Sequence, residues 1–217
     1  MAGAAPDSAI LSHWHWVTPL WYLQEVEGQR TDVPARFVYP DGESYSGTWA
    51  GRVQEAFDGG QDVIATFYDP ATYQGLPLPE PVGEAYLFRH EPRTELPDGY
   101  EPLSVTLGDR IELVGYQQTA DSAQASEPVV LTVAWRPIGE PVEGLSLFAH
   151  LLGPDNQVWG QEDVQVMPQP DGLTLTQFRV TPRPGTRWVR CCWGWAPIRM
   201  NRCRTRRAKC GCRWAMW

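Results

Sequence analysis

The chain has 217 residues and a formal net charge of −8, a length that suits one large or two small domains. Residues 1–186 carry nine basic and 26 acidic side chains, a charge of −17 that disfavours nucleic acid and anionic lipid as partners. The sequence has no run of about 18 apolar residues, so no transmembrane helix is predicted. Its first residues also lack the pattern of a signal peptide.

The first predicted element is a short apolar strand over Ala9–Ser12 that leads into a helix. Thr18 is expected to cap this helix, Pro19 suits its first turn, and Gly28 can end it in a left-handed conformation. Open α/β sheets bind ligands where a strand ends and the next helix begins. The candidate ligand-binding residues are therefore His13, Trp14, His15 and Trp16.

Two other interpretations of this stretch remain open. Leu20, Leu23 and Val26 recur at helical spacing, so the neighbouring tryptophans would then pack over a core rather than bind a ligand. His13 and His15 would share one face of a strand, but a metal site needs a third ligand from elsewhere. No metal is predicted.

Alternating strands and helices follow. Residues 33–39 are expected to form a second strand and residues 62–68 a third, with a helix between them that buries Trp49, Val53, Ala56 and Phe57 and stops at Gly59. This order predicts a small parallel sheet in a three-layer α/β half-domain. The sequence lacks the glycine patterns that bind dinucleotides or ATP, so no cofactor is predicted.

A proline-rich segment after Gly75 precedes Ala85–Arg89, which we expect to be an edge strand. Residues 90–102 contain three prolines and Asp98-Gly99, and are expected to link two domains. The predicted first domain therefore covers residues 1–90.

The second predicted domain, residues 91–186, has the alternation of antiparallel strands. Its inward-facing residues are expected to be Ile111, Leu113, Leu131, Val133, Trp135, Leu145, Leu147, Ala149 and Leu151. Residues 145–163 are expected to form a hairpin, and Leu173–Val180 the last well-ordered strand. The fold class is thus α/β plus all-β, with a β-sandwich that is incomplete.

The composition changes abruptly after Thr186. All five cysteines, the only lysine and five of the 11 tryptophans lie in residues 187–217. The cysteine spacing lacks the Cys-x-x-Cys pairs typical of metal modules. A shifted reading frame explains the tail better: for any codons used, Cys191-Cys192 then encodes Leu and Trp193-Gly194 encodes Gly. We interpret residues 187–217 as a frameshifted, unstructured tail that replaces a final strand.

Three segments resemble a known protein family. Residues 16–33, Trp-Val-Thr-Pro-Leu-Trp-Tyr-Leu-Gln-Glu-Val-Glu-Gly-Gln-Arg-Thr-Asp-Val, resemble a segment after the membrane region of large bacterial multi-pass glycosyltransferases related to protein O-mannosyltransferases. That family has Arg-Pro-Asp-Val where this chain has Arg30-Thr31-Asp32-Val33. Residues 107–116 and 147–155 resemble a β-sandwich appended to such proteins on the extracytoplasmic side.

The resemblance implies a non-catalytic, extracytoplasmic portion of a membrane glycosyltransferase that supports the enzyme or recognises its glycan acceptor. The implied partners are the membrane-embedded region of the same protein and a glycan, and the implied location is the extracytoplasmic face of the cell membrane. No catalytic residue is assigned, because the family is expected to keep its catalytic carboxylate near its first membrane helices.

Two alternative functions follow from the residues themselves. A stand-alone carbohydrate-binding module would use exposed aromatic side chains, and the candidates are Trp14, Trp16, Tyr116 and Trp159. An independent α/β enzyme would use His13 or His15 as a base.

Overall fold

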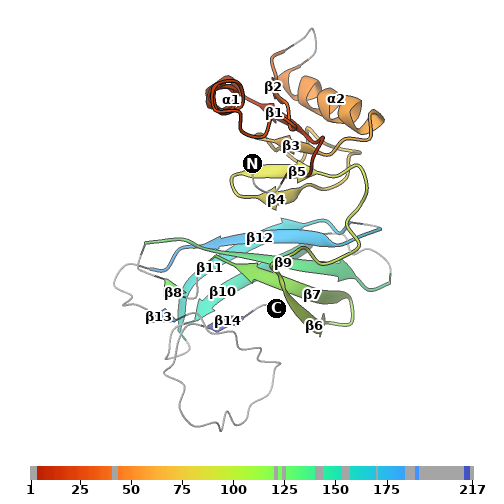
Figure 1. Ribbon diagram of the computed structural model, residues 1–217. Helices are drawn as coiled ribbons and strands as arrows, with labels where there is room; N and C mark the ends of the chain where they lie inside the picture. The colour runs from red at the N-terminus through yellow and green to blue at the C-terminus, as the bar shows by residue number, and fades with distance from the viewer. Residues whose placement is uncertain are drawn as a thin grey trace. The chain divides into compact units, whose positions relative to one another are not determined.

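A computed structural model describes residues 4–40, 44–119, 122–123, 126–139, 144–152, 157–169, 171–183, 189–190 and 213–215. The chain divides into two compact units, Met1–Thr94 and Glu95–Trp217. The first is an α/β unit, and the second is built from antiparallel sheets as a β-sandwich (Figure 1). Among the described residues, no helix has the length and apolar character needed to cross a membrane.

The first unit contains one mixed sheet of five strands. In chain order they are β1 (Ala9–Ser12), β2 (Ala35–Phe37), β3 (Val63–Ala65), β4 (Glu80–Val82) and β5 (Ala85–Phe88). Their spatial order is β2-β1-β3-β5-β4, in which β1 is parallel to β2 and β3, and β5 is antiparallel to β3 and β4 (Figure 1). The expected parallel strands are confirmed: β1 has its predicted bounds, whereas β2 and β3 are shorter than predicted.

One detail of the predicted sheet is wrong. Strand β5 is internal rather than an edge, because the proline-rich segment supplies β4 as its outer neighbour. Pro81 has no N–H to donate to a further strand, which suits this edge position.

Successive side chains of each strand point to opposite faces of this sheet. Each face has its own apolar cluster. Leu11, Val63 and Phe88 lie in one apolar cluster with Trp49 and Val53 of helix α2 (Tyr45–Asp58). Ile10, Ile64 and Leu87 lie in a second cluster, against which Leu20 of helix α1 (Trp14–Trp21) packs. The expected three layers are therefore present.

Helix α1 begins earlier than predicted. His13 is the extended residue before the helix, and the N–H groups of Trp16 and Val17 both donate to its carbonyl. Thr18 lies inside the helix, where its hydroxyl donates to the carbonyl of Trp14 at 3.0 Å instead of capping. Trp14, His15 and Trp16 thus form the first helical turn rather than a loop.

The end of this helix also differs from a regular α-helix. A π-helical turn, η1 (Tyr22–Val26), follows α1, and Gly28 ends it at φ +66° as expected. The wider turn rotates the buried face, so Val26 is exposed and Gln24 is buried. The Gln24 side chain donates to the carbonyls of Arg30 and Val33 and accepts from the N–H of Ala35, which directs the chain into β2.

The second unit contains two principal sheets. One has the order β12-β9-β7-β6, and the other β11-β10-β14. The strand bounds are β6 (Glu101–Leu107), β7 (Ile111–Gln118), β8 (Ser122–Ala123), β9 (Val129–Pro137), β10 (Leu145–Leu152), β11 (Val158–Val166) and β12 (Thr174–Val180). The predicted hairpin of β10 and β11 is confirmed, and β6 begins inside the segment predicted as a linker.

A single apolar core joins these sheets. It contains the predicted inward-facing residues of β7, β9 and β10, with Leu145 only partly buried at its margin. Trp135 is fully buried, and its indole N–H donates to Thr176 Oγ1 at 2.9 Å. At Gly160, strand β11 lies close to the end of β12. An added Cβ would lie 2.7 Å from Val180 and 2.8 Å from the Thr181 carbonyl oxygen.

The tail was predicted to contain no folded element, but five of its residues lie in short strands. Strand β13 (Val189–Arg190) pairs with β8, and β14 (Arg213–Ala215) pairs with His150–Leu152 of β10. The other residues from Arg187 onward lie outside the described part of the chain, so for them the unstructured tail stays a prediction.

Candidate functional site

The carboxyl ends of β1 and β3 lie side by side because the two strands are parallel neighbours. The backbone N–H of His13, just after β1, donates to Thr66 Oγ1, just after β3, at 3.3 Å. The Thr66 hydroxyl donates in turn to Ser12 Oγ at 3.3 Å. These contacts connect the two strand ends and fix the backbone from which the His13 side chain projects.

The His13 imidazole lies among three aromatic side chains from two other parts of the chain. Its ring centre is 5.0 Å from that of Trp49, 5.8 Å from that of Tyr45 and 5.8 Å from that of Phe67. Tyr45 and Trp49 come from the first turns of α2, and Phe67 follows β3. The sheet therefore brings residues that are far apart in sequence into one aromatic cluster.

Burial lowers the pKa of His13 below its ordinary value of 6.5, and the nearby His15 lowers it further. The ring is therefore neutral at pH 7. The Tyr45 hydroxyl is hydrogen-bonded to Nδ1 of His13. Because a neutral imidazole accepts at one nitrogen, Tyr45 can donate to Nδ1, which leaves the hydrogen of the ring on Nε2 as a donor.

The two candidate tryptophans are not part of the core. Trp14 is 56% exposed and Trp16 is 58% exposed, and His15 is exposed between them. The interpretation that these indoles pack over the core is therefore wrong. The predicted pair of adjacent indoles is also wrong, because residues i and i+2 of a helix do not face each other.

Trp14 has aromatic neighbours that the sequence did not suggest. Its ring centre lies 5.5 Å from that of Phe37 and 6.2 Å from that of Trp21, and both contacts are edge-to-face. Phe37 is stacked with Tyr39 at 5.7 Å. The indole N–H of Trp21 donates to the Ala35 carbonyl at 2.8 Å and fixes that ring against β2.

The segment that carries the resemblance has a structural role at its end. Arg30 Nε lies 3.0 Å from Asp32 Oδ1, and its guanidinium also donates to the Ala4 carbonyl at 2.9 Å. Val33 is fully buried. This turn holds the helix and β2 together, and its residues lie outside the aromatic cluster around His13.

The aromatic candidates of the sandwich are not available as a ligand platform. Tyr116 is 8% exposed, and its hydroxyl donates to Glu101. Trp159 is partly buried against the sandwich core. Of the four aromatic side chains proposed from sequence for sugar binding, only Trp14 and Trp16 are exposed.

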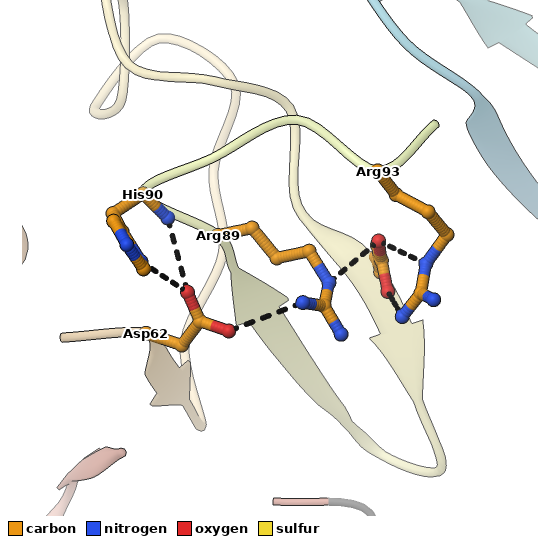
Figure 2. Close-up of polar contacts among 5 residues, drawn as sticks. Asp62, Arg89, His90 and Arg93 are labelled. Atoms are coloured by element: carbon orange, nitrogen blue, oxygen red, sulfur yellow. Dashed lines mark hydrogen bonds and ion pairs between the residues drawn. The ribbon is translucent and has the colours of Figure 1, made fainter. Parts of the chain in front are cut away.

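A separate charged cluster lies where β3 begins and β5 ends, at the end of β3 that is remote from Thr66. Asp62 accepts from the backbone N–H of His90 at 3.1 Å and from its Nδ1 at 2.7 Å, and its other oxygen lies 3.2 Å from Arg89 (Figure 2). Glu80 lies 2.9 Å from Arg89 and 2.7 Å from Arg93. Both carboxylates are nearly buried and balanced by cations, so this cluster holds residues 89–93 on the sheet.

No group of three or more histidine, cysteine, aspartate or glutamate side chains in the described ranges could hold a metal ion. The neighbours of the His13 ring among the described residues are aromatic rings and the Tyr45 hydroxyl.

The sequence pattern pointed to His13 and Trp14 but not to Tyr45, Phe67, Phe37 and Tyr39. Each of these four residues reaches the site through strand pairing or helix packing, for which local sequence gives no signal.

The chain matches no family model, and no curated protein or solved structure has a significant similarity to it.

Proposed function

We propose that this chain is a non-catalytic, extracytoplasmic portion of a membrane glycosyltransferase, and that it recognises the glycan acceptor or supports the catalytic region. The resemblance of residues 16–33, 107–116 and 147–155 motivates the assignment to that class of enzyme. In this proposal the membrane-embedded region of the same protein performs the chemistry.

One observation carries the glycan-binding part of the proposal. The exposed indoles of Trp14 and Trp16 lie in the first turn of α1, directly after the carboxyl end of β1. This is the edge at which open α/β sheets bind ligands, and an exposed indole offers a flat apolar face to the C–H face of a sugar ring. The Nε2 hydrogen of neutral His13 adds a donor nearby.

Binding of neutral oligosaccharides to the purified chain tests the proposal. Replacing Trp14 and Trp16 together with Ala is expected to weaken binding, while the melting temperature stays within a few degrees because both indoles are exposed. A chain that binds no oligosaccharide, or a double variant that binds as tightly as the unchanged chain, would contradict glycan recognition at this edge. A large loss of stability would instead assign the indoles a structural role.

The exposure of the aromatic side chains favours one of the two carbohydrate-binding alternatives. A stand-alone sandwich module would need Tyr116 and Trp159 at the surface, and neither is exposed. The α/β unit is therefore the better location for a sugar.

A further inference from the structure

Four aromatic rings form a continuous row across α1 and β2, in the order Trp21, Trp14, Phe37 and Tyr39. Successive ring centres are 6.2, 5.5 and 5.7 Å apart. Trp14 and Tyr39 are 56% and 54% exposed, whereas Trp21 and Phe37 are partly buried. The row is therefore anchored by two rings and open to solvent at the other two.

The register of β2 explains why these rings meet. Ala35 packs in the apolar cluster on the α1 face of the sheet, and Phe37 and Tyr39 follow at alternate positions on that face. Val38, between them, is buried in the cluster on the α2 face. Because β2 is the outer strand of the sheet, Phe37 lies at its margin, where Trp14 at the start of α1 can contact it.

Trp16 lies away from this row. Each helical residue turns about 100°, so Trp16 is rotated by about 200° from Trp14 around the axis of α1. Its exposure is almost the same as that of Trp14, at 58%. The chain thus contains two equally exposed indoles on one helix, of which one belongs to the row.

We propose that the row Trp21–Trp14–Phe37–Tyr39 is the sugar-binding element, that it takes an uncharged glycan of more than one sugar unit, and that Trp16 does not contribute. This inference rests on the proposed function and assigns its ligand class and contact residues. Two exposed rings separated by a third give separate apolar faces for successive units, and the Tyr39 hydroxyl supplies a polar tip.

Charge decides the class of ligand. Residues 1–94 carry 13 acidic and five basic side chains, a formal charge of −8 that repels acidic glycans. Residues 14–39, which include the row, carry three acidic side chains, Glu25, Glu27 and Asp32, and two basic ones, Arg30 and Arg36, of which Arg30 is paired with Asp32. This balance leaves no cluster of basic residues beside the rings, which makes an anionic lipid surface a poor alternative as their ligand.

The test uses the full chain, with mannohexaose and maltohexaose as neutral probes and a hexamer of galacturonic acid as the acidic probe. Affinity is measured by isothermal titration calorimetry, and folding of each variant by its melting temperature. Trp14→Ala and Tyr39→Ala are each expected to weaken binding of a neutral hexaose by about two- to tenfold, the loss of one aromatic stacking contact. Trp16→Ala, the matched control, is expected to leave affinity unchanged, and Trp14→Phe to retain most of it.

The outcomes separate this inference from the proposed function. If a hexaose binds but Trp16→Ala weakens it while Tyr39→Ala does not, the row is wrong and glycan recognition stands. If the acidic hexamer binds more tightly than the neutral ones, the ligand class is wrong. If no oligosaccharide binds, this inference and the glycan-recognition part of the proposed function both fail. A Trp14→Phe variant that binds no better than Trp14→Ala would also contradict stacking.

Discussion

Asp62 accepts two hydrogen bonds from one residue, His90: its Oδ1 lies 3.1 Å from the backbone nitrogen and 2.7 Å from the imidazole Nδ1 (Figure 2). Asp62 directly precedes β3 and His90 is the second residue after β5, so the contact joins the ends of two antiparallel strands. The Asp62 side chain is nearly buried, and its other oxygen contacts Arg89. Removing its charge would therefore leave the His90 backbone N–H and imidazole without this acceptor, and the partly buried Arg89 with Glu80 alone.

We expect Asp62→Ala to lower the free energy of unfolding of the first unit by about 2 to 4 kcal/mol, because a nearly buried charged acceptor is lost. Urea denaturation followed by tryptophan fluorescence measures this change. Glu55→Gln is the control, since it weakens only the exposed ion pair with Arg52 and should change stability by about 0.5 kcal/mol or less. Equal effects of the two substitutions would contradict a stabilising role for the buried cluster.

Two glycines give opposite predictions. Gly51 lies inside α2 with no atom within 4 Å of an added Cβ, so Gly51→Ala should stabilise the chain by about 0.5 to 1 kcal/mol. Gly160→Ala should destabilise it by about 1 to 3 kcal/mol, because its Cβ would meet Val180 and the Thr181 backbone. Thermal denaturation of both variants measures the two changes. A neutral Gly160→Ala would show that β11 and β12 can separate without cost.

The lowered pKa of His13 predicts a pH dependence of stability. In the unfolded chain this histidine titrates near 6.5, whereas burial disfavours the protonated ring in the folded chain. As the pH falls below about 6.5, the unfolded state therefore takes up a proton more readily, and stability decreases until the folded pKa is reached. Above that window both states are neutral at this position and His13 makes no pH-dependent contribution.

Comparing His13→Asn with the unchanged chain isolates this contribution from that of the carboxylates. Unfolding free energies, measured at intervals from about one pH unit above the ordinary histidine pKa to about two units below it, should fall less steeply in the variant. If both proteins lose stability in parallel, the titration of His13 is not linked to folding.

The tail gives a prediction about solubility. A reading frame restored after Thr186 is expected to supply a full final strand, whereas β14 pairs with only His150–Leu152 of β10. The uncorrected chain should therefore associate through an incompletely paired sheet edge. Sedimentation velocity and melting temperature compare the two proteins. If they melt at the same temperature and are equally monomeric, the replaced strand was never part of the core.

Local sequence was enough to predict most of the elements. Alternating apolar residues placed Leu131, Val133 and Trp135 correctly in the sandwich core, because a strand with one buried face must alternate. The helical spacing of Trp49, Val53 and Ala56 likewise identified the buried face of α2. The left-handed end at Gly28 followed from the conformational freedom of glycine.

The errors arose where one local signal had to be chosen over another. Thr18 and Pro19 together are a good start for a helix, but the extended conformation of His13 allows α1 to begin at Trp14 instead. The N–H of Val17 therefore already donates to the His13 carbonyl before Thr18 is reached. The π-helical turn then exchanged Val26 for Gln24 on the buried face. Neither choice is visible in the apolar pattern.

The sequence by itself determined the two-part organisation, the alternation of buried residues and the position of an aromatic stretch after β1. These properties follow from residues that are close together in the sequence, and they do not require contacts between distant segments. The tertiary structure alone decided which aromatic rings meet: β2 carries Phe37 to Trp14, and the pairing of β1 with β3 carries Phe67 and Thr66 to His13. Such contacts depend on strand order and register, which only the packing of the whole sheet fixes.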